Sequence, residues 1–401
     1  MLTGGYGRKN HLVLRLLKDP MPSERLDLQK ELLLKGVEED SGDQGIWGLQ
    51  SSGKLKEKMR GPYAIRMYAS SEDGRYYLWT QESFREFRDF WFSDAGFRHP
   101  RRLTEANPQQ KQYAWGRSRM VKWMRADGEI NQGVLYLPED YDSTRTWPVL
   151  VQFYETHTDA LHTYFIPSLS RGMLDIPTCV SRGYVVVMPD VHFRVGEPGQ
   201  SSYEAVVSGT EMLIRAGIAD PQRIALQGHS WSGCQGAYLV GQTSLFRCAI
   251  LGAAVVDMVS AYGGIRKGNG QPRMFMYEET QSRMGKSIWE DPEAYIRNSP
   301  LFYADRITTP LLLFHCDADE AVPYSQGMEF YFAMRRLQKP AWLLNYKGEG
   351  HFLSHREAMK DWTQRMLQFL DHYLAGQPEP LWMKEGITLD ERKTDLKLRI
   401  P

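Results

Sequence analysis

Ser230 lies in the run GHSWSG at 228–233, whose residue types resemble those of a nucleophile elbow. In that motif, written G-x-S-x-G, a sharp turn from strand to helix lifts the serine hydroxyl clear of a sheet. Ser232 stands where the motif has its second glycine, so a Cβ and a hydroxyl are added at a crowded position. The run alone leaves open a working elbow, a decayed elbow or a chance turn. We expect Ser232→Gly to leave activity equal or to raise it.

A nucleophilic serine needs a base, and the base needs a carboxylate that orients it. In α/β hydrolases these residues follow in the order Ser, acid, His, each in a loop after a strand. Asp319 follows an apolar run at 310–315 and lies 89 residues after Ser230, and His351 follows another apolar run 32 residues later. The order and the placement at predicted strand ends make a chance arrangement of these three residues improbable.

Several longer motifs resemble the prolyl oligopeptidase family of serine peptidases. These are the pattern H-x-x-x-D-x-x-V-P-x-x-Q at 315–326, the run GHSWSG, Y-x-x-x-S-P at 295–300, LFYAD at 301–305 and GEGH at 348–351. The resemblance covers about 119–376. It implies Ser230 as nucleophile, Asp319 as acid and His351 as base. It selects Asp319 over the nearby carboxylates Asp317 and Glu320, and His351 over His355.

The resemblance also implies an oxyanion hole with two donors. One is the backbone N–H of Trp231, and the other is the hydroxyl of Tyr154, at the end of the apolar run 147–154. Glycines often follow this tyrosine in the family, whereas this chain has Glu155-Thr156-His157, so the role of Tyr154 is less firmly implied than the triad. The side chain of Trp231 either forms a wall of the pocket for the substrate residue before the scissile bond or packs under an insertion in the domain.

The elements that would position these residues alternate along the chain. Apolar runs predict buried strands at 147–154, 184–190, 223–230, 248–256, 310–319 and 341–348. Amphipathic stretches predict helices at 202–217, 234–244, 326–338 and 361–376. Near-continuous runs of Val, Ile and Leu are typical of a mostly parallel sheet covered on both faces. We therefore predict a doubly wound α/β-hydrolase domain at 119–376, with an insertion at 257–309 that either lines the site or lies on the surface, and a peripheral tail at 377–401.

Residues 1–118 have a different pattern of apolar and polar residues. Short runs with partial alternation at 11–17, 63–71, 76–83 and 87–94 predict strands of an antiparallel sheet, and 28–36 predicts a helix. This part resembles the last blades of the family's N-terminal β-propeller. Because 118 residues provide only two or three four-stranded blades, we expect the chain to be a C-terminal fragment or a shortened gene product.

The composition gives no support to several classes of function. Lys+Arg and Asp+Glu number 49 each, so the charge gives no reason to expect binding to nucleic acid or to an anionic membrane. No apolar run is long enough to span a bilayer, and the N-terminal sequence lacks a signal-peptide pattern. The four cysteines have no zinc-site spacing, and we expect small buried thiols, no metal and no cofactor. Compartment and homo-oligomerisation stay open.

We therefore predict a serine peptidase that hydrolyses oligopeptides through an acyl-enzyme. One alternative is an esterase or acyl hydrolase with the same triad, because a fold does not fix a substrate. A second alternative is a catalytically weak remnant that acts as an interaction module. The residue preference before the scissile bond, and the choice between endopeptidase and dipeptidyl-peptidase action, do not follow from the sequence.

Overall fold

The computed structural model describes residues 5–17, 27, 29–388, 390–391, 394 and 396–399. The chain divides into two compact units, one formed by residues within 1–120 together with 158–166, the other by 121–157 and 167–401.

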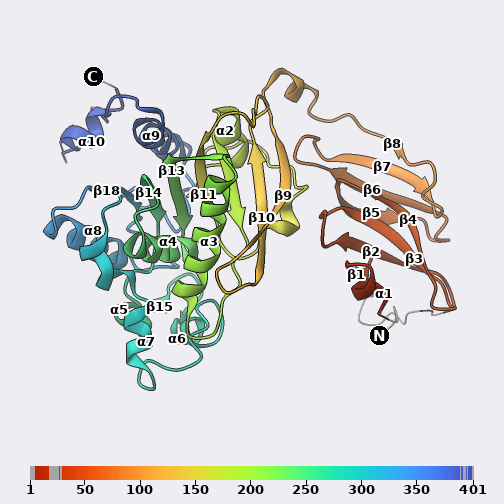
Figure 1. Cartoon of the computed structure of the whole chain (residues 1–401), viewed down its shortest axis with the longest axis horizontal. Helices are drawn as coiled ribbons and strands as arrows, with labels where there is room; N and C mark the ends of the chain where they lie inside the picture. The colour runs from red at the N-terminus through yellow and green to blue at the C-terminus, as the bar shows by residue number, and fades with distance from the viewer. Residues whose placement is uncertain are drawn as a thin grey trace. The chain divides into compact units, whose positions relative to one another are not determined.

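The first unit contains two four-stranded antiparallel sheets, each with its strands in chain order (Figure 1). The strands of the first sheet are β1 (Leu12–Leu16), β2 (Leu32–Glu38), β3 (Gln44–Leu49) and β4 (Leu55–Gly61). Those of the second are β5 (Ala64–Ser70), β6 (Tyr76–Glu82), β7 (Asp89–Asp94) and β8 (Arg101–Arg102). The short helices of this unit are α1 (Tyr6–Lys9), η1 (Pro108–Gln112) and η2 (Thr158–Ala160). A four-stranded antiparallel meander is the unit from which β-propellers are built.

The helix predicted at 28–36 was wrong, and residue 28 lies outside the described residues. Most of the stretch belongs to strand β2, which pairs antiparallel with both β1 and β3. Leu34 is buried in a cluster with Trp47, and the Trp47 ring lies where a Cβ on Gly36 would stand. Leu, Lys and Glu favour helices, but burial against neighbouring strands outweighs that weak preference here.

The second unit is built on an eight-stranded sheet with the order β18-β17-β14-β13-β11-β12-β10-β9. The strands are β9 (Arg117–Met124), β10 (Ile130–Leu137), β11 (Trp147–Gln152), β12 (Val185–Pro189), β13 (Ala219–His229), β14 (Cys248–Gly252), β17 (Leu311–Phe314) and β18 (Ala341–Leu344). Neighbouring strands in the part of the sheet ordered β12-β11-β13-β14-β17-β18 are parallel, and β10 pairs antiparallel with β12. The expected fold class, an α/β-hydrolase sheet preceded by an antiparallel β region, is confirmed.

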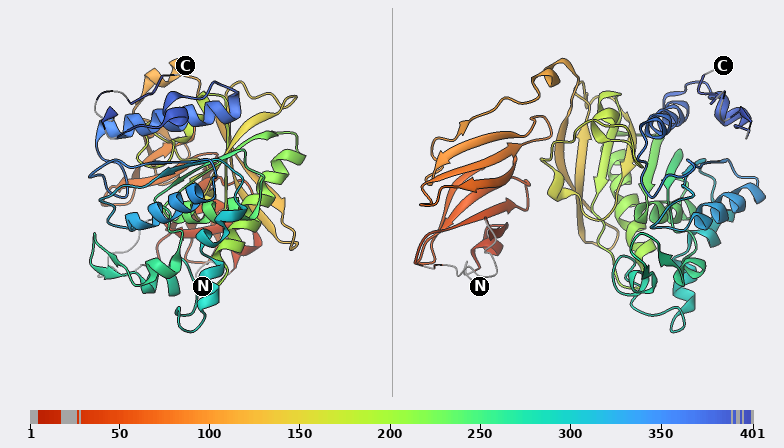
Figure 2. Two further views of the ribbon diagram at one scale, coloured as in Figure 1. Left: turned by 90° about the vertical axis from the view of Figure 1, so that its left-hand side faces the viewer. Right: turned by 180° about the vertical axis from the view of Figure 1, so that it is seen from behind.

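Helices cover both faces of this sheet, with α9 on one face and α3 and α4 on the other (Figure 2). The main helices are α2 (Ile176–Ser181), α3 (Pro198–Arg215), α4 (Trp231–Gln242), α8 (Tyr324–Arg336), α9 (Arg356–Ala375) and α10 (Leu381–Glu385). Alternate residues of a strand face opposite sides. Leu226 accordingly lies against Gly236 of α4, while Gln227 donates a hydrogen bond to Met366 of α9.

The segment 257–309 leaves the sheet after β14 and returns at β17. It folds as short pieces: α5 (Met258–Tyr262), β15 (Ile265–Arg266), β16 (Gln271–Pro272), α6 (Met274–Glu278), α7 (Pro292–Arg297) and η3 (Pro300–Arg306). Gln326 of α8 holds its start, because the Gln326 side-chain oxygen accepts hydrogen bonds from the N–H groups of Val256 and Asp257 at 3.0 and 2.9 Å. The segment is therefore anchored to the sheet domain by side-chain bonds as well as by its two ends.

All four cysteines are buried and unpaired, and burial raises the pKa of each thiol. Within the described residues, no helix has the length and apolar character needed to cross a bilayer.

Candidate active site

Ser230 occupies the turn between the end of β13 and the start of α4. Its backbone has φ 59° and ψ −120°, a conformation that residues other than glycine rarely adopt and that costs of the order of 1–3 kcal/mol. Hydrogen bonds on both sides hold it, since Ser230 N–H donates to the Gly252 carbonyl at 2.8 Å and Cys234 N–H donates to the Ser230 carbonyl at 3.0 Å. The turn places the side chain at the N-terminus of a helix, as a nucleophile elbow does.

Gly228 and Ser232, two residues before and two residues after Ser230, differ in the side chains that fit at their positions. A Cβ on Gly228 would stand 2.2 Å from the backbone oxygen of Ser232, so only glycine fits at 228. Ser232 is fully buried, and its hydroxyl accepts a hydrogen bond from the N–H of His229 at 2.9 Å and donates one to the carbonyl of the same residue at 3.0 Å. The turn thus accommodates the departure from the glycine motif and forms hydrogen bonds with it.

Asp319 and His351 meet at the carboxyl ends of β17 and β18. The Nδ1 atom of His351 lies 2.8 Å from Oδ2 of Asp319, and both side chains are buried. The other carboxylate oxygen accepts the N–H groups of Ala321 and Val322 at 2.7 and 2.8 Å. Burial acts to raise the pKa of Asp319, but the hydrogen bond and charge of His351 and the Val322 N–H together lower it below its ordinary value. The carboxylate is therefore stabilised as an anion beside the imidazole.

The residues passed over in favour of Asp319 and His351 have other partners. Asp317 accepts the N–H of Gly348 at 2.7 Å, and Glu320 accepts the backbone N–H of His351 at 3.2 Å. His355 is mostly exposed, and its Nδ1 lies 2.6 Å from the buried carboxylate of Glu349. These contacts position the loop around His351, and none of them joins the Asp319–His351 pair.

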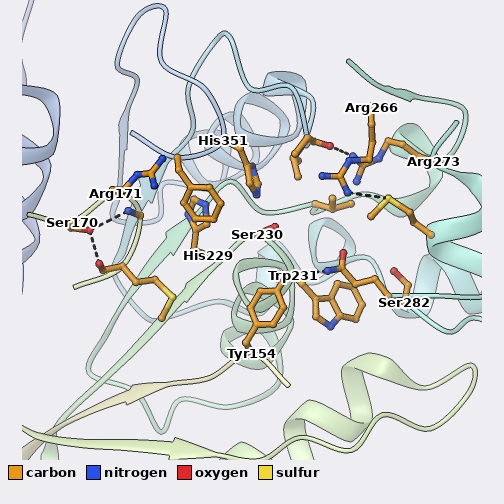
Figure 3. Close-up of a pocket in the computed structure, with 18 of the residues that line it drawn as sticks. Tyr154, Ser170, Arg171, His229, Ser230, Trp231, Arg266, Arg273, Ser282 and His351 are labelled. Carbon is orange, nitrogen blue, oxygen red and sulfur yellow. Dashed lines mark hydrogen bonds between the residues drawn. The ribbon is translucent and has the colours of Figure 1, made fainter. Parts of the chain in front are cut away.

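Tyr154 lies just beyond the end of β11 and faces Ser230 (Figure 3). Its hydroxyl accepts a hydrogen bond from the amide of Gln281 at 3.0 Å. Burial raises the pKa of Tyr154, and hydrogen bonds with the Ser230 and Gln281 side chains partly oppose that rise. The phenol is therefore a neutral hydroxyl next to the serine. Glu155, which follows Tyr154 directly, forms an ion pair with Arg283 at 3.0 Å and so ties the segment carrying Gln281 to this strand end.

His229 packs against the imidazole of His351, with ring centroids 4.9 Å apart. It is buried, and neither ring nitrogen has a hydrogen-bond partner among the described residues. Burial, and then the charge of His351, lower the pKa of His229 to about 3, so the ring is neutral at physiological pH. It serves as an aromatic surface behind His351, together with Phe352 at a centroid distance of 4.7 Å.

Several of these side chains, but not that of Asp319, line one pocket of about 630 Å³ (Figure 3). Ser230, His351, Tyr154 and the side chain of Trp231 all line it. Trp231 also packs against Phe193 at a ring distance of 5.5 Å, and it belongs to a buried cluster with Met258 and Tyr277 of the segment 257–309. Across the described residues, no group of three or more His, Cys, Asp or Glu side chains is arranged to hold a metal ion.

Sequence reasoning missed several residues that line the pocket. The segment 257–309 contributes Arg266, Arg273, Met276, Tyr277, Gln281 and Ser282. Its richness in glycine, methionine and charge singled the segment out but did not indicate which side chains turn inward. The loop before α2 contributes Arg171, which donates to the Leu353 carbonyl at 2.9 Å and so braces the loop that carries His351.

A family model and several relatives match this chain. The model of the prolyl oligopeptidase family matches residues 172–377, just over half of the chain. An uncharacterized peptidase of Bacillus subtilis, YuxL, is 23% identical over 329 residues, which cover 79% of this chain and 48% of that protein. The acylamino-acid-releasing enzyme of Rattus norvegicus is 28% identical over 187 residues, which cover 45% of this chain and 25% of that enzyme.

Solved structures show the same fold. The acylaminoacyl peptidase of Pyrococcus horikoshii superposes with a TM-score of 0.65 at 20% identity, covering 86% of this chain and 54% of that one. The chain thus spans about half the length of these relatives or less. With the family model matching half of its residues, the chain belongs to the prolyl oligopeptidase family of serine peptidases.

Proposed function

We propose that this protein hydrolyses peptide bonds through an acyl-enzyme formed on Ser230. His351 accepts the proton of the hydroxyl as Ser230 attacks the carbonyl carbon, and it then donates that proton to the leaving amine. Asp319 holds the imidazole in the tautomer that places its free nitrogen toward the serine, and stabilises the imidazolium that forms. A water molecule, deprotonated by His351 in the same way, then releases the acyl group.

The tetrahedral intermediate carries a negative charge on the former carbonyl oxygen. We assign two donors to it, the backbone N–H of Trp231 and the hydroxyl of Tyr154. Trp231 is the first residue of α4, so its N–H is one of the helix N-terminal groups without an intrahelical acceptor. Gln281 donates to the Tyr154 oxygen, which leaves the phenolic proton available for the oxyanion. Removing one such donor typically costs a few kcal/mol of transition-state stabilisation.

The observation that carries this proposal is the hydrogen bond of 2.8 Å between Asp319 and His351, which lines the same pocket as Ser230. Ser230 is additionally held with positive φ at a helix N-terminus, and such strain is concentrated at functional sites. Relatives and solved structures named as peptidases support cleavage of an amide.

Labelling with a fluorophosphonate tests the nucleophile. The folded protein should react, and Ser230→Ala should abolish labelling at an unchanged melting temperature. Asp319→Asn should lower kcat by about 10⁴, because the amide holds the wrong imidazole tautomer. A peptide anilide and a short acyl ester with the same acyl group then separate the reaction classes. Much higher kcat/KM on the ester than its greater intrinsic reactivity explains would favour an esterase, and a folded protein that does not react with the probe would contradict the whole proposal.

A further inference from the structure

The pocket beside Ser230 is lined by cations and by no carboxylate. Arg171, Arg266 and Arg273 contribute to its wall, whereas no aspartate or glutamate does. This local excess is not a consequence of composition, since basic and acidic residues are equal in number, 49 each. This wall offers no counter-ion to the free amino group of a peptide, whereas it offers three guanidinium groups to a carboxylate.

Arg273 is a buried cation without an acidic partner. Only 3% of the surface of Arg273 is exposed. Its Nε donates a hydrogen bond to the Tyr277 hydroxyl at 3.1 Å, and its Nη1 donates one to the carbonyl of Ala321. Both acceptors are neutral, and Arg273 forms no ion pair with a carboxylate among the described residues. Nη2 has no acceptor in that part of the chain. Burying a charge without a counter-ion is unfavourable, so a carboxylate entering the pocket would be strongly stabilised here.

Arg266 supplies a second such group next to the first. It is partly exposed, and its Nη1 contacts only the weakly accepting Met276 sulfur, at 3.4 Å. The two-residue strands β15 and β16 pair Ile265 with Pro272, and Arg273 N–H donates to the Gly264 carbonyl at 2.9 Å. This hairpin fixes both arginines, whose guanidinium groups lie on the same side of the pocket, across from Arg171 and His229 (Figure 3).

The same pocket also has apolar lining residues. These are Trp231, Val255, Tyr277 and Val322, which belong to one buried cluster. Trp231 follows the nucleophile directly, so an acyl residue whose carbonyl oxygen binds the Trp231 N–H places its side chain in this pocket. A side chain with a short methylene stem and a terminal carboxylate fits a lining that combines apolar surfaces with guanidinium groups.

We propose that the enzyme prefers an acidic residue, glutamate or aspartate, on the acyl side of the scissile bond, with its carboxylate bound by Arg266 and Arg273. This preference rests on the peptidase function proposed above. Arg273 has a structural contact as well, because it donates to the carbonyl of Ala321, two residues after Asp319. Arg266 has no comparable backbone bond from its guanidinium group in the described residues, so it is the cleaner residue to change.

The test compares two substrates, acetyl-Ala-Glu and acetyl-Ala-Gln linked to aminomethylcoumarin. They differ only by a carboxylate and an amide of the same shape, and neither has a free C-terminal carboxylate. We expect the wild-type kcat/KM to be at least tenfold higher for Glu than for Gln at pH 7.5. Arg266→Met should reduce this ratio at least fivefold, and Arg273→Lys, which keeps a charge, should reduce it less than Arg273→Met. The matched control is Arg297→Met, which removes the same charge from an exposed side chain of α7 outside the pocket and should keep the ratio.

Each other outcome contradicts a defined part of this reasoning. A Glu/Gln ratio of one or less, with the Gln substrate cleaved, overturns the acidic preference and leaves the peptidase function standing. A second outcome is a Glu/Gln ratio that stays high in Arg266→Met and in an Arg273→Met protein that is shown to be folded. That result overturns the assignment of carboxylate binding to these two arginines. A ratio near one, combined with faster cleavage of acetyl-Ala-Gln-Ala than of its C-terminal amide, means that the arginines bind a chain terminus instead. No cleavage and no fluorophosphonate labelling would overturn the proposed function and this preference together.

Discussion

Ser232→Ala tests whether the hydroxyl of Ser232 supports the nucleophile turn. The hydroxyl is fully buried and forms two hydrogen bonds, with the N–H and with the carbonyl of His229. A buried hydrogen bond between neutral groups contributes about 0.5–1.5 kcal/mol net, so the loss of both should lower the free energy of unfolding by about 1–3 kcal/mol. Ser232→Gly should cost about 0.5 kcal/mol more, because glycine is less favourable than serine or alanine inside a helix.

Catalysis should fall together with stability, because the same turn holds Ser230 in its strained conformation. We expect kcat to decrease by about tenfold in Ser232→Ala, since small displacements of a reacting group are costly in rate. This expectation replaces the one drawn from the motif, that glycine at 232 would leave the rate equal or raise it. Urea unfolding gives the stability change, and anilide hydrolysis together with fluorophosphonate labelling gives the rate.

Ser201→Ala is the matched control. Ser201 is buried, and its hydroxyl accepts the N–H of Arg194 at 3.0 Å and donates to the Glu197 carbonyl at 2.8 Å. It thus has the same pair of backbone bonds, near the start of α3 and away from the pocket. A similar loss of stability with unchanged kcat/KM is expected. If Ser232→Ala changes stability by less than 0.5 kcal/mol and Ser232→Gly is the faster enzyme, the hydroxyl has no supporting role and the reasoning is refuted.

Three further perturbations test other parts of the site. Tyr154→Phe should lower kcat by about 10²–10³ with a small change in KM, measured on an anilide, because one oxyanion donor is lost; an unchanged kcat would remove Tyr154 from that role. His229→Phe should weaken the acid dependence of stability. The folded pKa of His229 is about 3 against an ordinary 6.5, so between these values the unfolded chain binds a proton that the folded chain does not. This group alone should therefore lower the wild-type free energy of unfolding by about 1.4 kcal/mol per pH unit below about pH 6. Urea titrations between about pH 7 and 4.5 measure this free energy for both proteins. Parallel plots of the free energy of unfolding against pH for wild type and His229→Phe would contradict the expectation. Glu155→Gln should raise KM by about threefold, because its partly exposed ion pair with Arg283 steadies the segment that carries Gln281; additive effects in the double variant with Arg283→Met would argue against that coupling.

The parts of the fold that the sequence predicts well are those with long, regular patterns. Every strand expected between 147 and 348 is present, because runs of Val, Ile and Leu between helices leave few alternatives to a covered parallel sheet. The strands β3 and β4 were not expected, and β2 was taken for a helix. Strands β2 and β4 are partly exposed and contain Lys, Glu and Gly, and β3 is buried but has two glycines in six residues, so their conformation depends on partners distant in sequence.

The motif residues at 315–326 show how one pattern combines chemical and structural roles. His315 is buried, and its Nε2 lies 3.2 Å from the Val322 carbonyl and 3.5 Å from Asp319. Gln326 holds the start of the segment 257–309. The pattern therefore lies on a turn whose backbone and side chains are fixed together, and the family resemblance of this pattern is what selected Asp319 among three neighbouring carboxylates.

The substrate side of the pocket could not be predicted because it is built from irregular structure. Arg266, Arg273 and Gln281 lie on elements of two to five residues or on loops, whose paths are set by side-chain bonds and not by periodicity. The proposed reacting groups, in contrast, stand at the ends of long buried strands. This division has a physical consequence. We expect substitutions at Arg266 and Arg273 to change binding while the sheet keeps Ser230, Asp319 and His351 in place. Substitutions at the strand ends, or at Gln281, which donates to Tyr154, should act on the proposed chemical step. On this proposal, selectivity is altered by changing short, irregular elements that do not carry the proposed reacting groups.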